Sequence, residues 1–180
     1  EPILTVYISK LSKNVKNLSL ISGLAFSISG VANIIAAPKL GKLCDKIGVE
    51  KVMLICMILA GLLFIPQAFV TSVPQFIFLR FLLGLTMGGL VPGVNILVKK
   101  ITPNHLTGRI FGINIAAGYL GVFSGSILGG EITALFNIRW VFISTGIILL
   151  ANALLIYFKV YLKGDKFRKN FVTQNSFNHN

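Results

Sequence analysis

In a chain of 180 residues, 54% are hydrophobic and only 12% are charged, whereas about a quarter of the residues of a soluble protein are charged. Seventeen Lys and Arg against five Asp and Glu give a net charge of +12. These basic residues gather at the ends of apolar runs, which excludes the single basic face of a nucleic-acid-binding protein. The composition therefore predicts an integral membrane protein with no nucleic-acid partner.

Five apolar runs are long enough to cross a bilayer, since a helix rises about 1.5 Å per residue and the hydrocarbon core is about 30 Å thick. Residues 1–9 are expected to be the end of a further helix whose beginning is missing, and residues 164–180 form a basic tail that is predicted to be disordered. The predicted spans are residues 19–38, 52–71, 75–98, 108–133 and 140–161. The sequence thus predicts an all-α integral membrane bundle whose first helix is truncated.

The first complete span carries Gly23, Ser27 and Gly30 at intervals of three or four residues. Small residues at this spacing let a second helix approach closely, which is how spans associate in lipid. We therefore expect this face to pack against another span.

A short polar strip, Gly41 to Lys51, separates the first two complete spans. It is too charged to lie in hydrocarbon, and its glycines allow the chain to turn. We therefore predict a loop between two membrane spans, in which Asp45 is either a solvated charge that caps the next helix or a functional acid.

The basic residues also predict the orientation of the chain. Alternating spans divide the loops into two sets, one with twelve Lys and Arg and the other with four. Because cytoplasmic loops carry the excess of Lys and Arg, the richer set, which includes the polar strip and the C-terminus, is assigned to the cytoplasm.

Arg80 is the one formal charge deep within a predicted span. An Arg at the membrane centre costs at least about 2.5 kcal/mol on insertion scales, so Arg80 is expected to face a wet cavity or a paired acid. The alternative is that its side chain extends to the outer headgroups.

The sequence offers no enzyme motif, cofactor site or metal site. The stretch Gly84 to Gly89 lacks the Lys-Ser/Thr that follows in a phosphate-binding loop. His105 has no acidic or cysteine neighbour, and Cys44 and Cys56 match no zinc or redox spacing. We predict that the chain is not an enzyme and that both thiols are free.

Three patterns together resemble the signatures of the major facilitator superfamily. The polar strip reads Gly41-x-Leu-x-Asp45-Lys46-x-Gly48, which is similar to the superfamily's cytoplasmic loop, and Glu50 departs from it because the signature is basic there. Arg80 is followed by Gly84 and Gly88, as in a second superfamily pattern. The third resembles the antiporter signature of the drug:proton branch, with Ser126 in place of the preferred proline, and it comprises Gly112, Gly121, Gly125, Gly129 and Gly130.

This resemblance implies a fold and a function. The order of the patterns matches the second half of a twelve-helix transporter, so the chain would be its C-terminal six-helix bundle, from the end of helix seven to helix twelve. Such transporters rock two bundles about a midplane site by alternating access. The implied partners are the missing N-terminal half, protons, a lipophilic small molecule and the lipid bilayer of a bacterial plasma membrane.

The resemblance also implies roles for single residues. Asp45, with Gly41, Lys46 and Gly48, would form a gate that holds one state of the transporter shut. Polar residues within spans are candidates for the cavity or for proton coupling, and they are Tyr7, Ser27, Asn33, Arg80, Asn95, Asn114 and Tyr119.

Three functions remain open at this point. The first is half of a proton-coupled multidrug efflux transporter, inactive without its other half. The second keeps the fold but transports a sugar or another metabolite. The third is a membrane interaction protein that bundles helices without transporting anything.

Overall fold

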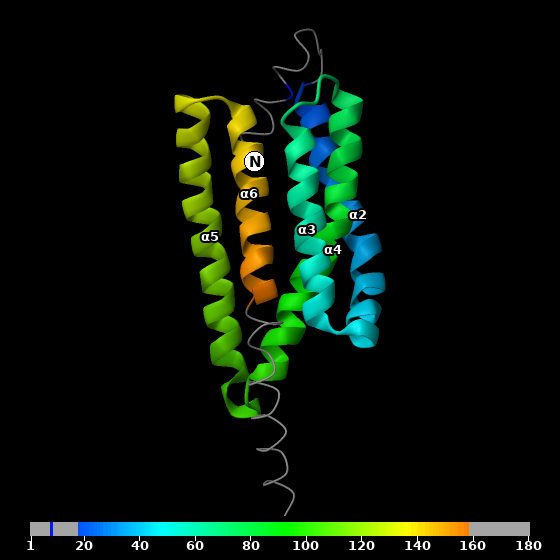
Figure 1. The fold of residues 1–180 in the computed structure, drawn as a ribbon, viewed down its shortest axis with the longest axis vertical. Coiled ribbons are helices and arrows are strands. Elements are labelled where there is room, and N and C mark those ends of the chain that lie inside the picture. Colours follow the sequence, from blue (N-terminus) through cyan, green and yellow to red (C-terminus); the bar gives the residue numbers. More distant parts are fainter. Residues whose placement is uncertain (1–7, 9–17, 159–180) are drawn as a thin grey trace, which may run out of the picture.

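The computed structural model describes residue 8 and residues 18–158, and all its regular elements there are helical. Five of the helices are long and apolar enough to cross a membrane, which confirms the predicted all-α membrane architecture. They run along a common axis (Figure 1). The helices are α2 (Leu18–Ile47), α3 (Val49–Gln67), α4 (Val73–Ile101), the short 3-10 helix η1 (Asn104–Leu106), α5 (Thr107–Leu135) and α6 (Ile138–Tyr157).

Two predicted segments fall largely outside the described residues. The truncated helix over residues 1–9 is represented only by Ile8, and the tail over residues 164–180 is not described. Tyr7, a cavity candidate, is also outside this part of the chain.

The polar strip is mostly helix, which corrects the loop predicted from Gly41 to Lys51. α2 continues through Pro38 to Ile47, and α3 begins at Val49. Lys and Leu, which dominate residues 39–47, are good helix formers, so polarity here marks where the helix leaves the hydrocarbon and not where it ends. With 30 residues, α2 is about 45 Å long and exceeds the hydrocarbon core.

Gly48 alone makes the turn between α2 and α3. Its φ is +97°, a value that glycine adopts without strain because it has no Cβ. The Gly48 N–H donates to the Cys44 carbonyl at 3.0 Å, and the Val52 N–H donates to the Gly48 carbonyl at 3.3 Å. The turn therefore uses backbone groups from both helices.

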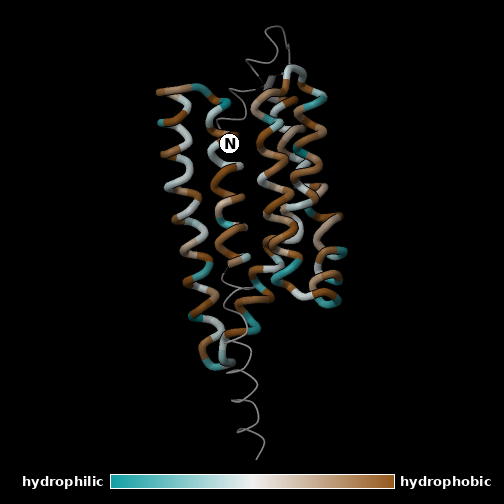
Figure 2. Tube along the Cα trace, viewed as in Figure 1, coloured by the Kyte–Doolittle hydropathy of each residue, from teal (hydrophilic) through white to brown (hydrophobic). Residues whose placement is uncertain are grey.

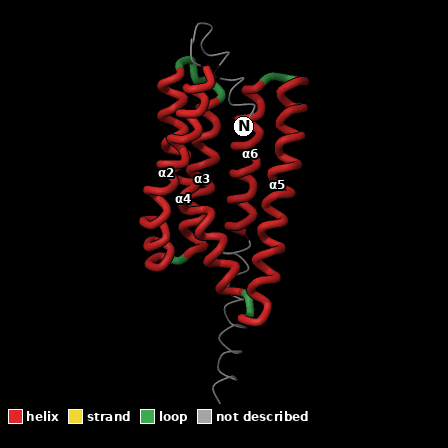
Figure 3. Tube along the Cα trace, turned by 180° about the vertical axis from the view of Figure 1, so that it is seen from behind, coloured by secondary structure: helices red, strands yellow, loops and turns green. Residues whose placement is uncertain are grey.

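α4 organises the bundle. It packs against α2 on one side and α3 on the other, α3 also packs against α6, and α5 has its main contacts with α6. Figures 1 and 3 show α5 at the edge of the bundle, beside α6 and away from α2. In Figure 2 the hydrophilic colour gathers at the turns at both ends, as expected for spans that cross lipid.

Glycines of α4 determine its contact with α2. A Cβ at Gly84 would meet the Ser29 carbonyl oxygen and the Ala32 methyl group, and a Cβ at Gly88 would lie 2.8 Å from the Cβ of Ala36. Both glycines are buried. The two backbones can approach only because these positions carry no side chain.

The face of α2 that carries Gly23, Ser27 and Gly30 packs against no described helix. A Cβ at Gly23 or Gly30 would meet nothing within 4 Å, and Ser27 is exposed. The α2 residues that contact α4 are Ser29, Ala32 and Ala36, which also recur at three and four residues. Two faces of one helix have the same small-residue spacing, so spacing alone could not distinguish them.

Candidate functional site

Asp45 lies near the end of α2, one turn before Gly48. Its side chain is exposed and forms no salt bridge with any described residue. The adjacent Lys46 is also exposed. α3 begins without a side-chain cap hydrogen bond, so the predicted alternative in which Asp45 caps the next helix is wrong. The end of α2 thus presents an acid that forms no salt bridge within the described part of the bundle.

Glu50 and Lys100 connect α3 and α4 at the same end of the bundle. The Lys100 Nζ lies 3.2 Å from the Glu50 Oε1. Glu50 is in the first turn of α3 and Lys100 is in the last turn of α4, where the helix dipoles favour an acid and a base respectively. The sequence singled out Glu50 only as a departure from the superfamily pattern. The available signal for the two charges was their position, an acid in a first helical turn and a base in a last turn.

We expect this pair to contribute little to stability. The Lys100 side chain is 62% exposed and that of Glu50 is 30% exposed, and exposed pairs contribute at most about 1 kcal/mol. A double-mutant cycle with Glu50→Gln and Lys100→Gln, read from unfolding in mixed micelles, should give a coupling energy below about 1 kcal/mol. A coupling energy several times larger would show that this ion pair contributes substantially to holding α3 and α4 together.

Arg80 lies between α4 and α6 and not against an acid. Its guanidinium carbon is 5.1 Å from the ring centroid of Phe76 and 6.0 Å from that of Phe142. The two rings meet edge to face, with 6.1 Å between their centroids. A cation over aromatic faces is stabilised by the ring quadrupoles, which gives this half-buried charge a favourable environment inside the span.

The Arg80 Nε is buried and has no hydrogen-bond partner in the described part of the chain. A buried donor that lacks a partner costs about 1–3 kcal/mol. The predicted partner acid is not found among the described residues, where the recorded salt bridge joins Glu50 and Lys100. Among the described residues, the Arg80 Nε is thus a donor without an acceptor.

Most of the antiporter-like glycines of α5 are exposed, and they occupy more than one side of the helix, because Gly112 and Gly121 lie nine residues and so about 180° apart. A Cβ at Gly112, Gly121, Gly125 or Gly130 would meet nothing within 4 Å, and Gly129 is the one residue of α5 that is buried. Tyr119, on the same helix, is 72% exposed. Within the described bundle the exposed glycines of this set, which exclude Gly129, pack against no neighbouring helix.

The other cavity candidates are spread over several helices. Asn95 is exposed on α4, Asn114 is half-buried on α5, and Asn33 is half-buried on α2 with its carbonyl facing Gly88. The described residues hold no group of three or more His, Cys, Asp or Glu that could bind a metal ion. Cys44 and Cys56 are both free and buried.

Comparisons with known proteins identify the family. The sequence profile of the Major Facilitator Superfamily matches residues 3–176. A protein named Multidrug resistance protein MdtG from Salmonella schwarzengrund (strain CVM19633) is 42% identical over 153 residues, and its namesake from Yersinia enterocolitica is 43% identical over 156 residues. These alignments cover 85% and 87% of this chain but 38% of each relative. The chain belongs to the Major Facilitator Superfamily of membrane transporters.

Proposed function

We propose that this chain supplies the second six-helix bundle of a proton-coupled multidrug efflux transporter that works by alternating access. The observation that carries the proposal is the 42% identity, over 85% of the chain, to a relative named Multidrug resistance protein MdtG. The three patterns are best known in the first half of such transporters and recur in the second half as repeats, and we assign this chain to the second half. Its partners are the N-terminal half, protons and a lipophilic substrate, and its location is the bacterial plasma membrane.

In this proposal Asp45 is the acid of a gate between the two bundles. It is exposed at the end of α2 and free of salt bridges within the described chain. The one-residue turn at Gly48 fixes the position of Asp45 along the bundle axis relative to α3. When the bundles rock together at this end, Asp45 pairs with a group of the other bundle, and when they separate it returns to water.

The side of α5 that carries Gly121 and Gly125 is assigned to the boundary with the other bundle. Because these glycines, four residues apart, leave room for close approach, a helix of the other half can slide against this side as the bundles move. Asn114 and Tyr119 on α5, and Asn95 on α4, are assigned to the substrate cavity. Of these, Tyr119 and Asn95 are exposed in the described bundle and Asn114 is half-buried.

Arg80 is assigned to proton coupling. The predicted test is Arg80→Lys, which keeps the charge but loses the flat guanidinium over Phe76 and Phe142. We expect proton-driven efflux to fall while downhill substrate exchange persists, both measured in vesicles that contain the full-length transporter. Loss of both activities together would indicate a structural role, and retention of both would contradict the assignment.

The decisive experiment is a transport assay on the full-length transporter in vesicles. A fluorescent lipophilic dye should be extruded when an imposed proton gradient is present and not after the gradient is collapsed. Dye movement that is indifferent to the gradient contradicts proton coupling. Gradient-driven movement of a sugar in place of the dye supports the metabolite transporter, and movement of neither contradicts transport.

The proposed orientation has its own prediction. Cys44 and Cys56 are 2% and 3% exposed, so the native chain should react poorly with a membrane-impermeant thiol reagent. A cysteine introduced by Lys51→Cys, at an exposed position of the polar strip, should react in inverted vesicles and stay unreacted in intact cells. Strong labelling in intact cells would reverse the orientation, and the native chain is the matched control.

A further inference from the structure

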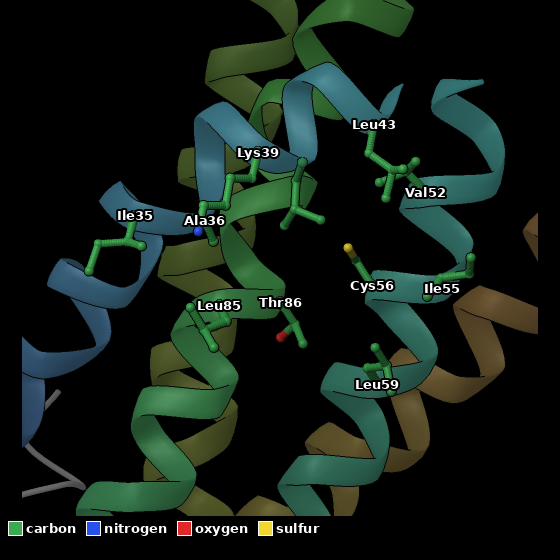
Figure 4. A pocket seen from close by; sticks show the side chains of 11 residues that line it. Ile35, Ala36, Lys39, Leu43, Val52, Ile55, Cys56, Leu59, Leu85 and Thr86 are labelled. Atoms are coloured by element: carbon green, nitrogen blue, oxygen red, sulfur yellow. The ribbon is translucent and has the colours of Figure 1, made fainter. Parts of the chain in front are cut away.

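A groove lies between α2 and α3, with α4 as its back wall. Figure 4 shows Lys39 and Leu43 of α2 on one side, Ile55 and Leu59 of α3 on the other, and Thr86 of α4 behind them. Its volume is about 410 Å³, within the range of about 300–1,000 Å³ usual for small-molecule sites. The groove contains none of the gate or cavity candidates described above.

The packing of the three helices explains why the groove exists. Gly88 brings α2 against α4 near Ala36, and the next residue, Gly89, faces Cys56 of α3 as well as Leu40 of α2. These contacts set α2 and α3 on two sides of α4. Pro38 removes a backbone donor inside α2, and the lower part of this helix bends outward (Figures 1 and 3). The two helices rejoin at Gly48, which closes the groove at that end.

The groove covers part of the depth of one membrane leaflet. Residues 19–38 carry no charge and cover about 30 Å of helix, so Lys39 is expected where the hydrocarbon meets the headgroups. The α3 side of the groove begins at Val52, directly after Lys51, and ends at Leu59. These residues cover about 12 Å of helix, compared with about 15 Å of hydrocarbon in one leaflet.

The lining is apolar except at Lys39 and Thr86, and the Thr86 hydroxyl donates to the Leu83 carbonyl of its own helix. This lysine is exposed and forms no salt bridge with a described residue. Ile35, Ile55 and Leu59 form an exposed apolar rim on helices that are long and apolar enough to cross a membrane. An occupant that complements this surface has an apolar chain and an anionic head, and Lys42, Lys46 and Lys51 add positive charge at the same end.

We propose that this groove is a binding site for an anionic phospholipid, with one acyl chain between α2 and α3 and the headgroup phosphate on Lys39. The site faces the membrane and is separate from the transport pathway. Lipid occupancy is measured without substrate or proton gradient, so the proposal stands or falls independently of the proposed function.

The headgroup contact is tested by native mass spectrometry of the full-length protein with phosphatidylglycerol and phosphatidylcholine of identical chains. Lys39→Gln should weaken phosphatidylglycerol binding about fivefold, the effect of one lysine beside an anionic lipid, and leave phosphatidylcholine unchanged. Lys42→Gln is the matched control, because Lys42 lies on the same helix outside the groove. Equal effects of the two variants would show diffuse surface attraction and overturn the proposal.

The chain contact is tested separately. Leu59→Trp places a bulky ring in the groove and should reduce binding of both lipids, whereas Leu62→Trp, at a similarly exposed position of α3 outside the groove, should not. Leu59 is 45% exposed and Leu62 is 51% exposed, so neither variant disturbs the core. The proposal would be overturned if Leu59→Trp had no effect on lipid binding. It would also be overturned if a lipophilic cation displaced the lipid and bound the Lys39→Gln variant more tightly than the native protein.

Discussion

Replacing Gly84 by alanine is expected to destabilise the bundle by about 1–3 kcal/mol, the usual cost of overpacking. The added methyl group would meet the Ser29 carbonyl oxygen and lie 2.8 Å from the Ala32 Cβ. A backbone oxygen cannot rotate away as a flexible side chain can, so α2 must move off α4. Since α4 contacts both α2 and α3, the shift reaches most of the bundle. Unfolding in mixed micelles of denaturing and mild detergent measures the loss.

Gly30→Ala is the matched control for this prediction. Gly30 lies on α2, beside Ser29, but a Cβ there would meet nothing within 4 Å. The substitution should leave stability unchanged or raise it, because alanine favours a helix over glycine by up to about 1 kcal/mol. If Gly30→Ala destabilised the protein as much as Gly84→Ala, the described face of α2 would be the wrong contact surface.

Asp45→Asn is expected to have the largest effect on transport. A hydrogen bond to a charged group contributes about 1.5–3 kcal/mol, and about 1.4 kcal/mol corresponds to tenfold in an equilibrium. Loss of the proposed gate pair should therefore slow dye efflux about ten- to hundredfold, because one of the two alternating states is no longer held. The measurement is proton-driven dye efflux from vesicles that contain the full-length transporter.

The controls for Asp45 separate the gate from general surface charge. Asp45→Glu should restore part of the efflux, because the charge returns with a longer reach. Glu50→Gln removes a nearby acid that already pairs with Lys100 at 3.2 Å, and it should change efflux little. Normal efflux with Asp45→Asn, or equal losses with Asp45→Asn and Glu50→Gln, would contradict the gate.

The sequence predicted the membrane spans well because the signal is local. A run of about 20 apolar residues is long enough to cross the hydrocarbon whatever its neighbours are. Each predicted run overlaps one of the five long helices, although the run predicted over residues 52–71 extends past the end of α3 at Gln67 and the run predicted over residues 140–161 extends past the described residues. The ends of these helices were less predictable. At Asp45 and Lys46 the chain becomes polar but remains helical up to Gly48. The polarity of a residue indicates whether it lies in water or in lipid, and it does not determine the backbone conformation.

The candidate site was predictable only in part. The sequence singled out Asp45 as a charge outside the hydrocarbon, and the structure adds that it is exposed and forms no salt bridge with a described residue. The aromatic surroundings of Arg80 were not predictable, because Phe142 is 62 positions away on another helix. The ion pair between Glu50 and Lys100 was not predictable for the same reason, because the two residues are 50 positions apart on different helices. Contacts across such separations depend on how the helices pack.

By itself, the sequence determined that this protein is a multi-span membrane bundle with an acid near the Gly48 turn, since hydropathy and backbone freedom are properties of single residues and short runs. Only the tertiary structure decided which small residues make contact. The glycines of α4 pack against Ser29 and Ala32, while those of α5 remain open. The groove beside Lys39 also arises only at this level. The physical reason is that close approach depends on the relative rotation and tilt of two helices, which no repeat within one helix specifies.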